Sequence, residues 1–271
     1  MRPDRFLVTG CASGIGRRLA DEIVRRGHRL VATDVAVGAL REHAGEAGWP
    51  AERVLAEPLD VRDPSAWERI VGLAESRWGG LDVAMNVAGY LHPGAVPQAG
   101  DEDVHRHFDV NVKGVVFGTQ AAARRMVRQG HGHIVNIASL AALAPIPGLA
   151  LYSASKYAVR AFSLAAAEDL RPHGVAVTTV CPDAVKTPMF DHQMDYPEAA
   201  LTFTAPKVLA VEEVSRVILG RVLERRPLLV VIPRWRGWLA RLADVLPSAS
   251  RVLASVLTRQ GLRRQAEWRK R

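Results

Sequence analysis

Tyr152 and Lys156, in the stretch Tyr-Ser-Ala-Ser-Lys, are the residue pair with the clearest chemical potential in this sequence. Residues four apart share one helix face, so the phenol and the ammonium can lie close together. A free tyrosine has a pKa of about 10, and acid–base work near neutrality needs a pKa lower by about 3, equivalent to about 4 kcal/mol. A neighbouring positive charge favours the phenolate. The pair predicts a proton-transfer centre; the alternative is a core-edge tyrosine beside a solvated lysine.

A glycine-rich stretch, residues 8–16, follows the first strand-like segment and precedes a helical one. Its glycines have the spacing G-x-x-x-G-x-G, which permits a tight turn and close approach of the backbone to a pyrophosphate at a helix N-terminus. We interpret it as a nucleotide-binding loop, although glycine-rich turns also occur for structural reasons. The expected contacts are Gly10, Ser13, Gly14, Ile15 and Gly16.

Further cofactor contacts are predicted where other strands end. Asp34 closes the second strand-like segment, where a carboxylate can accept both ribose hydroxyls and would repel a 2′-phosphate. This favours NAD over NADP, unless Asp34 is a solvated loop acid. The other expected contacts are Asp60 and Val61 beside the adenine, and Asn86, Ala88 and Gly89 where small residues admit the cofactor.

These residues must be positioned by an alternation of strands and helices. The strand-like segments are residues 5–8, 28–34, 53–61, 81–89, 133–139, 175–182 and 228–232, and helical patterns include 14–27, 63–78, 101–129 and 211–226. Apolar strands with intervening helices predict an α/β, Rossmann-type, doubly wound fold with a seven-stranded parallel sheet. We assign residues 1–233 to one cofactor-binding and catalytic domain and 234–271 to a helical tail.

The motifs together resemble the short-chain dehydrogenase/reductase superfamily over roughly residues 5–233. They are T-G-x-x-x-G-I-G at residues 9–16, N-x-A-G at 86–89, Ser139, and Y-x-x-x-K at 152–156. The resemblance implies that Tyr152 is the general acid/base, that Ser139 orients the substrate oxygen, and that Asn111 holds a water behind Lys156 in a proton relay.

The stretch Cys-Pro-Asp-Ala-Val-Lys-Thr-Pro, residues 181–188, is similar to the P-G-x-x-x-T-P segment of that family. The resemblance implies that Thr187 contacts the nicotinamide carboxamide, that Pro182 shapes the floor below it, and that Val185, Tyr152 and Lys156 also contact the cofactor. Asp183 stands where the family usually has glycine. It is either a harmless substitution or a carboxylate near the substrate.

Residues 188–210 lie where the family has its variable substrate lid. The large apolar residues of this segment are Phe190, Met194, Tyr196, Leu201 and Phe203. They suggest a lipid-like, steroid-like or aromatic alcohol or ketone, although they would serve equally to pack against the body or a partner subunit. His92, in the loop after the fourth strand, is a weaker candidate for substrate contact.

The tail carries the whole excess charge of the chain. Its ten Lys/Arg and two Asp/Glu account for the net charge of +8, and the first 233 residues are balanced. Large apolar residues recur at helical spacing, namely Trp235, Trp238, Leu239, Leu242 and Leu246, then Val252, Leu253, Val256 and Leu257. Such a tail suits peripheral contact with anionic lipids or packing on the enzyme or a neighbouring subunit, whereas nucleic acid is disfavoured by the neutral body.

Composition sets the outer limits. The chain has 271 residues and is 48% hydrophobic, enough for one sizeable core, and no uncharged apolar run reaches membrane-spanning length. A strand begins almost at the N-terminus, so we predict a cytoplasmic protein, with peripheral contact at the inner membrane surface as an option. Cys11 and Cys181 are expected as buried free thiols, and no metal site is predicted.

The sequence thus favours an NAD-dependent oxidoreductase that interconverts a hydrophobic secondary alcohol and a ketone. A non-catalytic NAD-sensing protein and a membrane-associated scaffold of the same fold are the alternatives. By resemblance, the helical stretch 101–129 and the small-residue face after Tyr152 build a homodimer or homotetramer.

Overall fold

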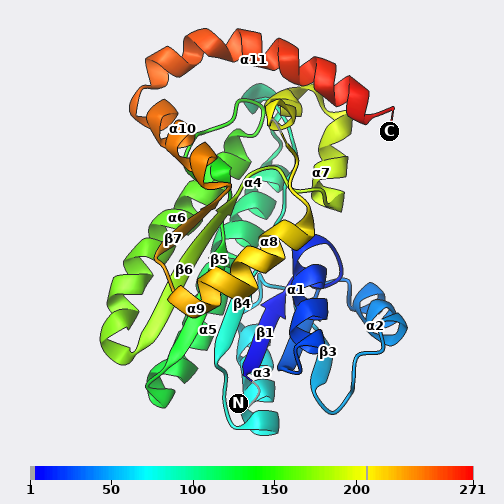
Figure 1. Ribbon diagram of the computed structural model, residues 1–271, viewed down its shortest axis with the longest axis vertical. Coiled ribbons are helices and arrows are strands. Elements are labelled where there is room, and N and C mark those ends of the chain that lie inside the picture. Colours follow the sequence, from blue (N-terminus) through cyan, green and yellow to red (C-terminus); the bar gives the residue numbers. More distant parts are fainter. Residues whose placement is uncertain (1–3, 206, 271) are drawn as a thin grey trace.

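A single sheet of seven parallel strands, in the order β3-β2-β1-β4-β5-β6-β7, forms the centre of the protein (Figure 1). The coordinates are a computed structural model that describes residues 4–205 and 207–270, apart from the side chains of 247–255. The strands are β1 (Arg5–Thr9), β2 (Arg29–Asp34), β3 (Val54–Pro58), β4 (Val83–Asn86), β5 (Gly132–Ile137), β6 (Val175–Pro182) and β7 (Leu229–Ile232). Each coincides with a predicted segment, so the predicted parallel sheet is confirmed.

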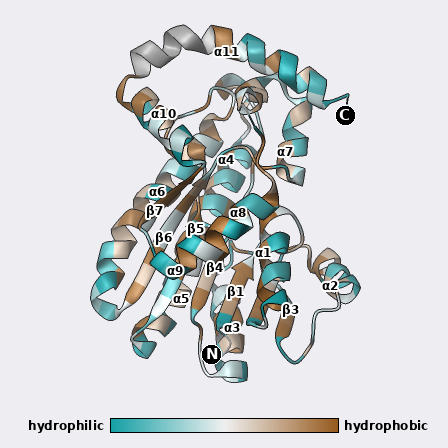
Figure 2. Cartoon of the chain, viewed as in Figure 1, coloured by the Kyte–Doolittle hydropathy of each residue, from teal (hydrophilic) through white to brown (hydrophobic). Residues whose placement is uncertain are grey.

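Helices cover both faces of the sheet (Figure 2). Because successive side chains of a strand point to opposite faces, Phe6 and Val8 of β1 belong to one core cluster and Leu7 to the other. The first face is covered by α1 (Gly14–Arg25), α2 (Val37–Glu46) and α8 (Val211–Val217), and the second by α3 (Pro64–Trp78), α5 (Gly114–Gln129) and α6 (Ala150–Leu170). This burial explains why the strands are apolar on both sides.

The predicted helices differ in how closely the sequence marks their ends. Helix α3 begins where Asp63 accepts a hydrogen bond from the Ser65 amide, with Pro64 in the first turn, and ends at Gly79 in the left-handed conformation. Helix α2 was not predicted, because Leu40 is its one fully buried residue and its apolar periodicity is weak.

The predicted helical stretch 101–129 is interrupted at a functional candidate. It comprises α4 (Asp101–Phe108), a π-helical turn (Asp109–Lys113) and α5. The wider turn carries Asn111, which is fully buried. An interruption of this kind rotates the residues within it relative to the flanking helix, and π-turns often occur at functional sites.

The segment after β6 leads over the carboxyl ends of the strands. It contains α7 (Pro188–His192) and the 3₁₀ helices Gln193–Asp195 and Pro197–Thr204, and then α8, a π-turn (Ile218–Val222) and α9 (Leu223–Arg225) lead into β7. We call residues 188–210 the lid.

Residues 234–270, which we call the C-terminal extension, form α10 (Arg234–Val245) and α11 (Pro247–Trp268). Figure 1 shows these helices arching above the lid, at the end of the molecule opposite the N-terminus. Within the described part of the chain, no helix combines the length and the apolar character needed to cross a bilayer. Cys11 and Cys181 are both buried free thiols, as predicted.

Candidate active site

The glycine loop is held against the end of β4 by short backbone contacts. The Thr9 hydroxyl accepts hydrogen bonds from the Val87 and Ala88 amides, both at 3.0 Å. Gly10 has φ +73°, and a Cβ there would lie 3.0 Å from the Ala88 backbone. Gly14 has φ +55°, and a Cβ there would come within 3.1 Å of the Thr187 side chain. A residue with a side chain would therefore strain the backbone and crowd the cradle at either position.

Asp34 is fixed where β2 ends, beside the glycine loop. Its two carboxylate oxygens accept the amides of Ala12 and Ala36, each at 2.9 Å. A carboxylate has about four acceptor positions, so Asp34 retains capacity for two ribose hydroxyls. The Arg17 guanidinium donates to the Ala12 carbonyl and so braces the loop.

Asp60 lies near the same loop and is paired with Arg62, a residue that sequence reasoning did not single out. The Arg62 guanidinium hydrogen-bonds both Asp60 oxygens and holds the pKa of that carboxyl below its usual value. Both side chains line the main cavity. Nothing in the sequence indicated that Arg62 pairs with Asp60, because Arg62 belongs to no motif and is one of many arginines in the chain.

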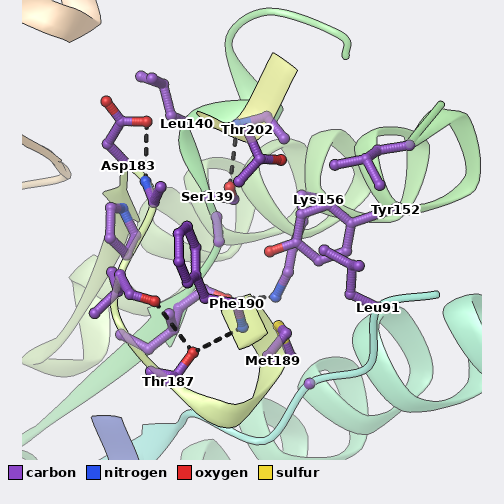
Figure 3. Close-up of a pocket in the computed structure, with 18 of the residues that line it drawn as sticks. Leu91, Ser139, Leu140, Tyr152, Lys156, Asp183, Thr187, Met189, Phe190 and Thr202 are labelled. Carbon is purple, nitrogen blue, oxygen red and sulfur yellow. Dashed lines mark hydrogen bonds between the residues drawn. The ribbon is translucent and has the colours of Figure 1, made fainter. Parts of the chain in front are cut away.

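Tyr152 and Lys156 project from the first turns of α6 into the same cavity, facing Phe190 and Met189 of the lid (Figure 3). The Lys156 ammonium lies 5.6 Å from the centre of the Tyr152 ring and donates to the Ile137 carbonyl at 3.0 Å. The predicted meeting of the two side chains on one helix face is therefore observed.

Ser139 follows β5 and completes this group. Its hydroxyl oxygen accepts the Ala141 amide at 3.1 Å, which leaves the hydroxyl proton to be donated to the Tyr152 oxygen or to a substrate oxygen. The same oxygen starts a short 3₁₀ helix, Leu140–Ala142, and this bond fixes its direction.

Burial sets the protonation of the pair. It raises the pKa of Tyr152 to about 12, while a hydrogen bond with Ser139 acts in the opposite direction. It lowers the pKa of Lys156 to about 8. The sequence analysis expected Lys156 to lower the Tyr152 pKa, but burial is the largest influence on that pKa and Lys156 is not among the groups that shift it. The phenol is therefore protonated at neutral pH in this arrangement.

Asn111 and Asn86 are placed differently from the other predicted site residues, because neither lines the cavity. The Asn111 amide is bound to the Tyr90 backbone, receiving its N–H at 2.7 Å and donating to its carbonyl at 2.9 Å, and it also donates to the Ser155 hydroxyl at 2.9 Å. Asn86 donates to Asn136 at 2.7 Å inside the sheet. The Asn111 amide thus positions neighbouring backbone, whereas Asn86 bonds the side chains of Thr119 and Asn136. Asn111 and Lys156 both lie beside Gly89.

The remaining predicted residues meet in one cavity of about 1150 Å³ that runs from the glycine loop to the lid. Those lining it are Gly10, Ser13, Gly14, Ile15, Gly16, Asp34, Asp60, Val61, Ala88, Gly89, Ser139, Tyr152, Lys156, Pro182, Val185 and Thr187. Thr187 also caps α7, accepting the Phe190 amide at 3.3 Å. The lining suits a dinucleotide, because it offers a glycine loop for a pyrophosphate, the Asp34 carboxylate for a ribose, and the group of Tyr152, Lys156 and Ser139 at the reactive end.

The far end of the cavity is mostly apolar, although Gln193, Thr202 and Thr204 also line it. The lid contributes Phe190 and Leu201, and the C-terminal extension contributes Leu239, Leu242, Leu246 and Leu257, which sequence reasoning did not place here. Phe203, which we also expected in the lid, is buried behind Phe190, with ring centres 5.0 Å apart. His92 packs against Tyr196 and His192 and does not line the cavity.

Asp183 joins the end of β6 to the C-terminal extension through an ion pair. It follows Pro182 at the carboxyl end of β6, and its carboxylate accepts from Arg236 of α10 at 2.7 Å. Its backbone has an ordinary negative φ, so a side chain is tolerated where the resembling family has glycine. The departure in sequence is thus explained by an ion pair with the C-terminal extension.

Comparison with known proteins agrees with this geometry. A family model of short chain dehydrogenases matches residues 5–197. The chain belongs to this family. This short-chain dehydrogenase is therefore an oxidoreductase acting on CH–OH groups, and small-molecule alcohols and ketones are its class of substrate. The match ends within the lid, so the C-terminal extension lies outside it.

Individual relatives resemble this short-chain dehydrogenase at moderate identity. An (S)-acetoin-forming diacetyl reductase of Staphylococcus epidermidis is 33% identical over 186 residues, covering 68% of this chain and 72% of the relative. A cyclopentanol dehydrogenase of Comamonas testosteroni is 33% identical over 224 residues, covering 79% and 87%. A crystal structure of a short chain dehydrogenase/reductase from Burkholderia phymatum in complex with NAD has a TM-score of 0.82 at 25% identity, covering 92% and 95%.

Proposed function

We propose that this short-chain dehydrogenase uses NAD to interconvert a hydrophobic secondary alcohol and its ketone. The observation that carries the proposal is one continuous cavity with a glycine cradle and Asp34 at one end, apolar walls at the other, and Tyr152, Lys156 and Ser139 between them. This order matches an extended dinucleotide whose reactive end meets the substrate beside Tyr152.

The preference for NAD rests on Asp34. Its carboxylate is held at the end of β2 by two backbone amides, next to the glycine loop. A ribose with two free hydroxyls can donate to it, whereas a 2′-phosphate would place like charges together. The solved relative from Burkholderia phymatum, which carries NAD, supports the same choice.

Proton transfer is assigned to Tyr152. In alcohol oxidation, Tyr152 acts as the phenolate and takes the hydroxyl proton while the carbon-bound hydrogen leaves as a hydride; in ketone reduction, the protonated phenol donates the proton. Bound NAD supplies the hydride acceptor and, in its oxidised form, a positive charge near the phenol. Lys156 adds the second positive charge, since its ammonium is held by the Ile137 carbonyl.

Orientation of the substrate is assigned to Ser139, whose hydroxyl lines the cavity beside Tyr152. Asn111 acts behind Lys156 as a positioning residue, because it ties the Tyr90 backbone to Ser155 on α6. The apolar substrate end, lined by Phe190, Leu201 and leucines of the C-terminal extension, favours bulky hydrophobic alcohols over small polar ones.

We also propose a homo-oligomer. Helix α6 exposes Ala150, Ala154, Ala161 and Ala165 along one side, and small residues permit close helix packing. The mass of the protein in solution tests this directly.

A substrate panel tests the proposed reaction. Hydrophobic and small polar secondary alcohols are offered with NAD and with NADP, and the absorbance of the reduced nicotinamide is followed. We expect turnover with NAD that increases with the apolar size of the alcohol. Cofactor binding without turnover of any alcohol or ketone would instead favour the NAD-sensing alternative.

A further inference from the structure

The outward face of α10 is a stripe of large apolar side chains. Trp235, Trp238, Leu242 and Val245 recur at helical spacing and are 50%, 70%, 58% and 75% exposed. Among the described side chains of α11, Val256 is likewise a large apolar residue that is exposed. Contiguous exposed patches of this kind commonly mark an interaction site.

The opposite side of α10 is firmly attached, so the stripe is not a helix left undocked. Gly237 packs closely on Val231 of β7, and Ala240 is buried. Arg236 pairs with Asp183, and Asp244 accepts from the Tyr157 hydroxyl of α6 at 2.7 Å. Because the inner side has specific partners, the stripe is exposed on an anchored helix, with Leu242 at its edge beside the cavity.

Cations border the stripe. Arg234 and Arg241 flank it on α10, and the Arg241 guanidinium lies 5.7 Å from the centre of the Trp238 ring. Arg259 and Arg263 continue the charge on α11, and all four side chains are exposed. Within the part of the chain that the structure describes, none of the four has a carboxylate partner. This face therefore combines large exposed apolar side chains with positive charges that no carboxylate of the described residues neutralises.

We propose that this face docks on an anionic lipid bilayer. Tryptophan and aliphatic side chains enter the interfacial region of a bilayer while arginines contact anionic headgroups, which is the pattern of an interfacial helix. A second copy of the chain would set these arginines against their own equivalents. The contact is a surface one.

The position of the cavity gives this docking a use. Leu239, Leu242, Leu246 and Leu257 line the cavity and are also partly exposed, so its apolar end opens along the edge of the stripe. A hydrophobic alcohol dissolved in the bilayer would reach Tyr152 along apolar walls. This second step rests on the proposed function, whereas lipid binding itself needs no turnover.

Sedimentation with vesicles tests the docking. The full-length protein is mixed with phosphatidylcholine vesicles with or without phosphatidylglycerol, at low and high salt. We expect strong cosedimentation with the anionic vesicles at low salt and weaker binding at high salt or without phosphatidylglycerol. The W235S/W238S and R234E/R241E proteins should each bind about tenfold more weakly.

Matched controls separate this face from general stickiness. Leu228→Ser removes an exposed apolar residue just before β7, and Arg77→Glu reverses an exposed charge on α3. Both proteins should bind as tightly as the unchanged one, and cofactor binding confirms that every variant is folded. The proposal is overturned by absence of binding to anionic vesicles, by equal losses in the controls, or by W235S/W238S dissociating an oligomer without affecting vesicle binding.

Discussion

The cofactor end of the cavity is built from backbone and small residues, whereas its substrate end is built from large side chains. At the cofactor end, Gly10 and Gly14 leave space, and hydrogen bonds of Thr9 and Asp34 to backbone amides fix the surrounding loops. At the substrate end, the C-terminal extension is attached by a few specific pairs. The cofactor end is shaped for a ligand that stays the same. The side chains of the substrate end can be replaced to suit another substrate while the reaction stays the same.

The largest difference in activity is expected between substitutions of the two α6 tyrosines, Tyr152 in the cavity and Tyr157 beside the C-terminal extension. Tyr152→Phe removes the proton-transferring hydroxyl, so the turnover number should fall about 10³-fold with the NAD dissociation constant unchanged. Tyr157→Phe is the control, because its hydroxyl bonds Asp244 of the C-terminal extension. It should leave turnover nearly intact. Full turnover by Tyr152→Phe would remove the central residue of the proposed site.

Cofactor choice should change through Asp34 alone. Asp34→Ser removes an ionised acceptor of ribose hydroxyls, worth about 1.5–3 kcal/mol, and it removes repulsion of a 2′-phosphate. Binding of NAD should weaken about tenfold or more while binding of NADP improves, as measured by titration of each cofactor. An unchanged ratio of the two dissociation constants would show that Asp34 does not select the cofactor.

The attachment of α11 should affect the substrate end selectively. Gln265 is buried and donates to the Gln193 and Tyr196 carbonyls at 2.9 and 2.8 Å. Gln265→Ala removes both hydrogen bonds, although each carbonyl keeps a backbone N–H donor, and it should lower the free energy of unfolding by about 1–3 kcal/mol. The KM for a bulky alcohol should rise without a change in NAD affinity. Exposed Gln260 on the same helix is the control, and equal effects of Gln260→Ala would argue against a specific attachment.

The smallest effect is expected from the ion pair that joins the two ends. Asp183 and Arg236 are largely shielded, so a double-mutant cycle with Asp183→Asn and Arg236→Gln should give a coupling energy of about 1 kcal/mol. The exposed pair Arg171 and Glu168 serves as reference and should give about 0–0.5 kcal/mol. Coupling no larger than the reference would mean that the pair does not hold α10 in place.

Prediction from the sequence succeeded where a repeated physical pattern carries the structure. Apolar runs of strand length predicted all seven strands, and the Tyr–Lys spacing predicted a shared helix face. The glycine spacing predicted the strand–loop–helix junction, because few other residues tolerate a φ of +73° at Gly10. These signals are local, so a single stretch of sequence contains them.

The features that the sequence did not reveal depend on distant partners. Asp183 could not be matched with Arg236, since 53 residues separate them and many other arginines were available. The rotation of Asn111 depends on a π-turn that has no clear sequence signal. The spacing of the leucines in α10 predicts an amphipathic helix but does not tell what its apolar face contacts. Val252 and Leu253 of the predicted second stripe lie among the side chains that are not described. Long-range pairing, not local propensity, decides such placements.

One measurement tests most directly the claim that the sheet fixes the chemistry and the C-terminal extension selects the substrate. The ratio kcat/KM is measured with NAD for secondary alcohols of increasing chain length, on the unchanged protein and on L239A/L257A. We predict a rise of up to about fourfold per added methylene in the unchanged protein, and a shallower rise in the variant with the smallest alcohols unaffected. The same slope in both proteins would contradict the account.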